Sequence, residues 1–161
     1  DGSVSEAALN KVHVAGYPTD RNLDVSTYEG VYIIKKDGYY YMFLSTGQCC
    51  SGDYTYNVKV GRSDTILGEY KDHLGRTMKQ GAVGYGVVNQ NAHFIAVGHN
   101  SIIQDDAGTY FIVYHGFDAT IETRNARKML IDKLIWNEDN WPSTLGVAPS
   151  NNYRPGPELY L

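Results

Sequence analysis

The chain has 161 residues, the size of one ordinary domain, of which 42% are hydrophobic and 20% charged, and its formal net charge is −4. This composition excludes a disordered tail and argues against a nucleic-acid-binding protein, and no apolar run approaches the ~18 residues that cross a bilayer. Fourteen Tyr and 17 Gly favour strands and tight turns over helices, so we expect an all-β fold.

Strand patterns follow one another along the chain. Six runs alternate apolar and polar side chains or are rich in β-branched and aromatic residues: 31–36, 39–45, 54–60, 101–104, 109–115 and 128–136. The first two runs flank Asp37-Gly38, a pair typical of a two-residue hairpin turn. The fourth and fifth flank the longer turn 105–108. The sequence therefore predicts antiparallel hairpins.

Two long stretches of the chain resemble each other. Residues 33–43 parallel residues 102–113, and a third strand follows each pair of strands. Tyr41 and Phe111 occupy matching positions at a spacing of 111 − 41 = 70 residues. A repeated antiparallel sheet of three or four strands is typical of β-propeller blades, but two blades do not close a ring. We therefore expect either the C-terminal piece of a longer propeller or a small two-sheet sandwich.

Two polar residues share the spacing of the repeat. Glu29 precedes the first strand of the first copy and His99 that of the second, and 99 − 29 = 70. Equivalent positions in successive blades lie around one axis, so this carboxylate and imidazole are predicted to face a common cavity. The alternative is an exposed loop acid and a turn histidine with no shared role.

Seven segments, taken in order, carry a family resemblance: residues 28–35, 39–41, 49–52, 54–63, 98–103, 114–116 and 130–136. They include Tyr28-Glu29-Gly30 and Gly98-His99-Asn100-Ser101. Together they resemble the endo-1,5-α-L-arabinanases of glycoside hydrolase family 43 over about residues 26 to 142.

The resemblance implies part of a five-bladed propeller, with blade repeats at about 26–72 and 95–142 and a closing segment at 143–161. It implies inverting hydrolysis of α-1,5-linked arabinan, a plant cell-wall polysaccharide, by a secreted or periplasmic enzyme of bacterial type. No nucleic acid or membrane partner is expected.

The resemblance also assigns site residues. Glu29 matches the general acid, and His99 matches a histidine beside a central ion, usually calcium. Cys49, Cys50 and Asn100 match positions that contact substrate. For the two neighbouring cysteines we favour packed thiols over a vicinal disulfide, and they cannot staple a loop.

The general base and a second catalytic Asp of the family have no counterpart here. The surroundings of Asp20 and Asp24 match neither motif, while Asp37, Asp105 and Asp106 fall in turns and are interpreted as solvated. We expect the base on missing N-terminal blades or on a second chain, and we expect this chain alone to be inactive.

Several other residues receive structural interpretations. Tyr54 and Tyr56 are assigned to sheet packing, and His115 to the end of a buried strand. Arg124 and Arg127 border the last strand, and no pattern in the sequence supports contact between them and arabinose hydroxyls. Two further readings stay open: a β-xylosidase, α-arabinofuranosidase or xylanase-type relative, and a non-catalytic sugar-binding module.

Overall fold

The computed structural model describes residues 12–16, 28–50, 53–80, 83–121 and 127–160. Within these ranges the regular structure consists of strands and two single-turn 3-10 helices, η1 (Met78–Gln80) and η2 (Leu145–Val147). The prediction of an all-β chain is confirmed. None of the described helices has the length and apolar character needed to span a membrane.

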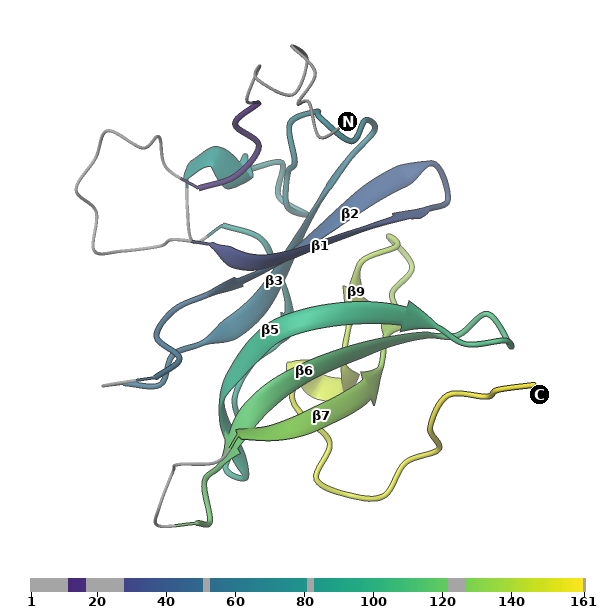
Figure 1. The fold of residues 1–161 in the computed structure, drawn as a ribbon. Helices are drawn as coiled ribbons and strands as arrows, with labels where there is room; N and C mark the ends of the chain where they lie inside the picture. The colour runs from purple at the N-terminus through teal and green to yellow at the C-terminus, as the bar shows by residue number, and fades with distance from the viewer. Residues whose placement is uncertain (1–11, 17–27, 51–52, 81–82, 122–126, 161) are drawn as a thin grey trace, which may run out of the picture.

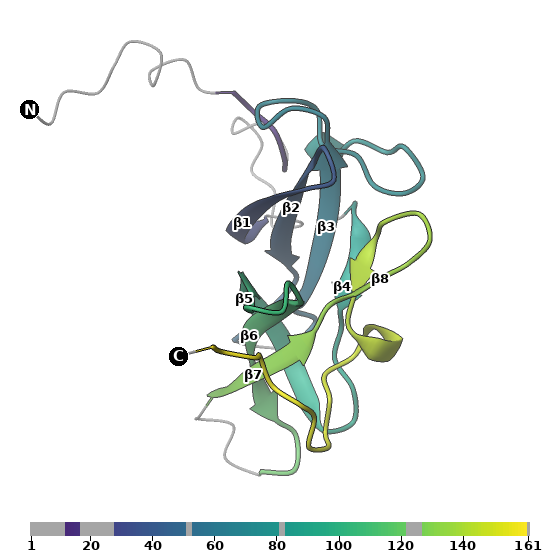
Figure 2. The same cartoon turned by 90° about the vertical axis from the view of Figure 1, so that its right-hand side faces the viewer.

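The first sheet contains four antiparallel strands in chain order (β1–β3 in Figure 1, β4 in Figure 2): β1 (Glu29–Lys36), β2 (Tyr39–Thr46), β3 (Asn57–Ser63) and β4 (Tyr85–Val88). The predicted turn joins β1 to β2, where Asp37 and Gly38 both have positive φ, 49° and 86°. That geometry suits an Asp-Gly pair because glycine carries no Cβ. The sequence patterns did not predict β4.

The second sheet contains three antiparallel strands: β5 (Phe94–Gln104), β6 (Tyr110–Asp118) and β7 (Arg127–Lys133). In the turn between β5 and β6, Asp106 is exposed as predicted, but Asp105 is buried and its interpretation as solvated was wrong. Its carboxylate accepts the backbone N–H groups of Thr109 at 2.6 Å and Glu158 at 3.1 Å. Asp106 accepts the N–H of Tyr160 at 2.7 Å. These two carboxylates therefore fasten the C-terminal segment to the sheet.

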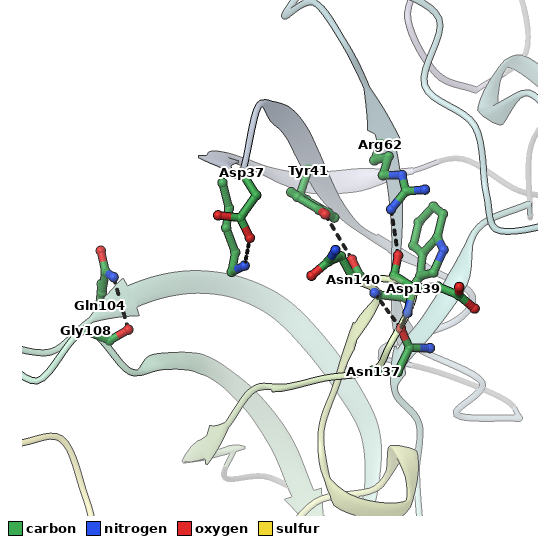
Figure 3. Close-up of polar contacts among 10 residues, drawn as sticks. Asp37, Tyr41, Arg62, Gln104, Gly108, Asn137, Asp139 and Asn140 are labelled. Carbon is green, nitrogen blue, oxygen red and sulfur yellow. Dashed lines mark hydrogen bonds and ion pairs between the residues drawn. The ribbon is translucent and has the colours of Figure 1, made fainter.

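A small hairpin follows the second sheet and returns to the first. Its strands are β8 (Ile135–Trp136) and β9 (Pro142–Ser143), so the predicted strand 128–136 is interrupted at the buried Leu134. The Tyr41 hydroxyl donates to the Asn140 carbonyl at 2.9 Å, and Arg62 donates to the Asp139 carbonyl at 2.8 Å (Figure 3). These two hydrogen bonds fasten the turn of the hairpin to β2 and β3 of the first sheet.

Both sheets and the hairpin share one hydrophobic core. Its fully or nearly buried members are Tyr41, Phe43, Val58, Val60, Val87, Val88, Val97, Ile102, Ile112, Tyr114, Leu134 and Trp141. The second sheet lies next to the first in both views (Figures 1 and 2), and β5 packs against β1, β2 and β3. This packing brings the start of β1 to the middle of β5, where the two repeat-related polar residues are found.

Candidate active site

Glu29 and His99 lie at matching irregularities of the two sheets. The pairing register shifts between Glu29 and Tyr32 on β1, and again between Gly98 and Ser101 on β5. Such bulges redirect side chains away from the regular alternation and are common beside active sites. His99 has a φ of 55°, in the left-handed region that non-glycine residues seldom adopt. The backbone therefore turns both side chains toward the contact between the sheets.

Two glycines allow the sheets to approach closely at this point. A Cβ on Gly30 would lie 3.3 Å from both Cα and Cγ of His99. A Cβ on Gly98 would lie 2.2 Å from Cε1 of Tyr56. Gly30 and Gly98, the glycines next to Glu29 and His99 in the sequence, thus allow the two sheets to touch because they carry no Cβ. The sequence patterns considered above did not use these glycines.

The hydroxyl of Tyr56 joins the acid to the imidazole. It donates to Oε1 of Glu29 at 2.5 Å and lies 3.4 Å from Nδ1 of His99. The backbone N–H of His99 donates to Oγ of Ser45 at 2.7 Å. The structure thus brings together the carboxylate and the imidazole that stand one repeat apart. The assignment of Tyr56 to packing is confirmed for its ring, which is buried in a cluster with Ala96 and Phe117, but its hydroxyl also contacts both polar groups.

His115 completes a column of three rings. It stacks on Tyr56 with ring centroids 5.9 Å apart and on His99 with centroids 6.3 Å apart. Burial, and then the positive charge of Arg127, lower the pKa of His115 from 6.5 to about 4, so its ring is neutral near pH 7. The strand-end interpretation was wrong, since this residue lies within β6 and faces the site.

The two cysteines form a disulfide, so the preference for packed thiols was wrong. Cys49 and Cys50 are joined with their Cα atoms 3.7 Å apart. Nη2 of Arg127 lies 2.8 Å from Sγ of Cys50, and Cys49 packs on the cluster that contains Tyr56 and Phe117. The disulfide therefore lies at the rim of the site, where Arg127 contacts it and also influences His115. Arg124 lies outside the described residues, as do Asp20 and Asp24.

Asn100 follows His99 on β5 but is buried, with 6% of its surface exposed. Neither atom of its amide group has a hydrogen-bond partner within the described ranges. Leaving such a group unpaired costs about 1–3 kcal/mol. The substrate contact assigned to Asn100 stays a prediction.

Hollows occur both at this cluster and away from it. One of about 340 Å³ is lined by His99, His115 and Arg127, among others. A larger cavity of about 480 Å³ lies between β7 and the C-terminal segment, where Asp105 and Asp132 already accept backbone N–H groups. The smaller hollow is lined by both imidazoles, and Tyr56 links His99 to Glu29 beside it, so we place the candidate active site there.

The described residues do not by themselves supply the ligands of a calcium site. In the described part of the chain, no group of three or more His, Cys, Asp or Glu side chains could hold a metal ion. Calcium takes six to eight oxygen ligands, and His99 offers only nitrogen. Calcium therefore stays a prediction from the resemblance, and no chemical step is derived from it.

Comparisons with known proteins agree with this picture. Residues 3–142 match the model of glycosyl hydrolases family 43. The extracellular exo-α-(1→5)-L-arabinofuranosidase ArbA of Cellvibrio japonicus is 38% identical over 115 residues, 71% of this chain and 32% of that protein. The extracellular endo-α-(1→5)-L-arabinanase 1 of Bacillus subtilis is 33% identical over 109 residues, 67% of this chain and 31% of that protein.

A solved structure gives the same result for the fold. The α-L-arabinanase of Cellvibrio cellulosa complexed with arabinohexaose superposes with a TM-score of 0.72 at 33% identity, covering 82% of this chain and 42% of that one. The part of this chain that matches the Cellvibrio japonicus and Bacillus subtilis relatives spans about a third of the length of each of them. Its two sheets are blades of a β-propeller rather than the layers of a sandwich, and the chain belongs to glycoside hydrolase family 43.

Proposed function

We propose that this chain supplies the general acid, Glu29, of an inverting glycosidase that cleaves α-1,5-linked arabinan. The observation that carries the proposal is the hydrogen bond from Tyr56 to Glu29 beside His99, at the contact between two blades. A carboxyl group that is held by a fixed donor presents its other oxygen in a defined direction. Such an arrangement suits proton delivery to a bound substrate.

The chemical step requires two carboxyl groups. Glu29 gives its proton to the glycosidic oxygen, and the bond from that oxygen to the anomeric carbon breaks with its electron pair retained by the oxygen. A second carboxylate, acting as base, deprotonates the water that attacks the anomeric carbon from the opposite face. In inverting enzymes the two carboxyl groups lie about 6.5–9.5 Å apart, which leaves room for that water. In the described residues, the cluster of Glu29, Tyr56, His99, His115 and Arg127 holds no second carboxylate.

The exposure of the Glu29 and His99 side chains supports a role for further blades in enclosing the site. Glu29 and His99 are both exposed in this chain. A general acid must keep its proton at the working pH, and enclosure away from water favours the protonated form. We therefore place the base, the second Asp and the remaining walls of the site on N-terminal blades outside this chain or on a second chain.

The relatives guide the substrate and the location. One is named for exo action on α-(1→5)-linked arabinose and another for endo action, and both are named extracellular. We propose arabinan as the substrate and a secreted or periplasmic protein. An exo-acting arabinofuranosidase is the second candidate, favoured by the 38% identity to the Cellvibrio japonicus protein.

Replacing Glu29 by Gln in the complete enzyme tests the proposal. The amide cannot protonate the leaving oxygen, so kcat on arabino-oligosaccharides should fall by about 10²–10⁴ with little change in KM. Glu69→Gln is the matched control, because Glu69 is an exposed carboxylate that pairs with Lys71 at 3.4 Å. Undiminished turnover by the Glu29 variant would refute the assignment.

Incubation of this chain alone with debranched arabinan tests the placement of the base. No reducing sugar should be released, because the described cluster holds only the acid. Hydrolysis by the chain alone would contradict that placement. Retardation in an arabinan-containing gel without hydrolysis, even after the remaining blades are added, would instead favour the sugar-binding module.

A further inference from the structure

We propose that Tyr56 is a positioning residue, whose hydroxyl keeps the transferable proton of Glu29 on Oε2 and stabilises the carboxylate left after transfer. The inference rests on the proposed role of Glu29 as general acid. It concerns the contact between a buried phenol, on the residue before β3, and an exposed carboxyl group at the start of β1.

The Tyr56 hydroxyl is a permanent donor. Burial and the hydrogen bond to Glu29 raise the pKa of Tyr56 well above its ordinary value of 10, so the phenol keeps its proton at every pH at which a glycosidase works. Tyr56 therefore takes no part in proton transfer itself. It presents one O–H, which it donates to Oε1 of Glu29 at 2.5 Å, whereas Nδ1 of His99 lies farther away, at 3.4 Å.

This bond distinguishes the two oxygens of Glu29. Because Oε1 accepts the phenol hydrogen, the transferable proton of the protonated acid is placed on Oε2. When Oε2–H breaks, its electrons stay on the carboxylate and the proton forms a bond to the glycosidic oxygen. Negative charge then spreads to Oε1, and the bond from Tyr56 changes from neutral to charge-assisted, which roughly doubles its strength. The hydroxyl therefore stabilises the transition state more than the ground state.

The ring has little freedom to leave this position. It is buried to 1% exposure and stacks on His115 at an interplanar angle of 16°. Its edge faces Gly98, where a Cβ would lie 2.2 Å from Cε1. A donor fixed in this way needs no reorganisation while charge develops on Glu29.

Tyr56→Phe in the complete enzyme tests the inference, because it keeps the stacked ring and removes only the hydroxyl. On arabino-oligosaccharides we expect kcat to fall about tenfold, with KM nearly unchanged. With an activated aryl leaving group such as 2,4-dinitrophenol, which needs no protonation, the loss should shrink to less than about threefold.

Tyr70→Phe is the matched control. It removes another buried phenol, which donates to the Ile66 carbonyl at 2.9 Å and lies outside both the cluster and the hollow beside it. This variant should show the same rate ratio between the natural and the activated substrate as the wild type. An equal loss for Tyr56→Phe on both substrates, or no loss on either, would overturn the inference.

Two further variants separate the possible failures. If Glu29→Gln keeps its activity on arabino-oligosaccharides, the proposed function itself fails. If Glu29→Gln is inactive there but rescued by the activated substrate while Tyr56→Phe behaves as wild type, only the role of Tyr56 fails. Should Tyr56→Phe not fold, 3-fluorotyrosine at position 56 keeps the shape and strengthens the donor. The ratio of kcat on arabino-oligosaccharides to kcat on the activated substrate should then rise, and an unchanged ratio would overturn the inference.

Discussion

The contact between Gly98 and Tyr56 allows a sharp test of how the site is built. In Gly98→Ala the new Cβ would lie 2.2 Å from Cε1 and 2.4 Å from Cδ1 of Tyr56, distances that real Cβ atoms do not show. The ring is fully buried and stacked on His115, so it cannot move aside without disturbing the core. Overpacking of this kind costs about 1–3 kcal/mol, and the closeness of two ring atoms places this case near 2–3 kcal/mol.

Differential scanning calorimetry of the chain measures the effect. For a domain of this length each kcal/mol lowers Tm by about 2–4 °C, so Gly98→Ala should lower Tm by about 4–12 °C. Gly86→Ala is the control, because Gly86 also lies in a strand and its Cβ would meet Val147 at an ordinary 3.4 Å. That variant should stay within about 0.5 kcal/mol of the wild type. Equal Tm values for the two variants would refute the packing argument.

Two other predictions concern His115 and the disulfide. The lowered pKa of His115 means that the unfolded chain binds more protons between pH 6.5 and about 4, so the free energy of unfolding should fall by on the order of 2 kcal/mol as pH drops through that window. In urea titrations His115→Phe should lose this part of the pH dependence, and an unchanged slope would contradict it. Reduction of Cys49–Cys50 should shift Tm by less than about 2 °C, because a bridge between neighbours closes no loop; a larger shift would show that the rim supports the fold.

The sequence predicted the strands where local chemistry decides. Asp37-Gly38 specified its hairpin because the turn needs two residues with positive φ, and the alternation from Val58 to Val60 marked a half-buried strand. The strand begins only at Asn57, since Tyr54 adopts a φ of 50° and the N–H of Tyr56 bonds to the Gln48 carbonyl. Alternation alone cannot reveal such a backbone turn.

The candidate site was predictable in position but not in composition. The 70-residue spacing predicted that Glu29 and His99 lie close together, because equivalent positions of adjacent blades are neighbours in space. It could not reveal that Tyr56 and His115 join them. A period-two pattern shows which side chains share one face of a sheet, but not which residues of a neighbouring sheet they contact. The disulfide was missed because two adjacent cysteines have the same sequence whether reduced or oxidised. The short strand β4 was missed because Tyr85–Val88 is only four residues long.

The glycine contact between the sheets also bears on when the protein becomes competent. Glu29 and Tyr56 are synthesised before Gly98 and His99, yet the Tyr56 ring packs against Gly98 of the later strand β5. Until β5 packs against the first sheet, the ring lacks the contact that fixes its hydroxyl beside Glu29. The orientation of the acid is therefore tied to completion of the neighbouring blade.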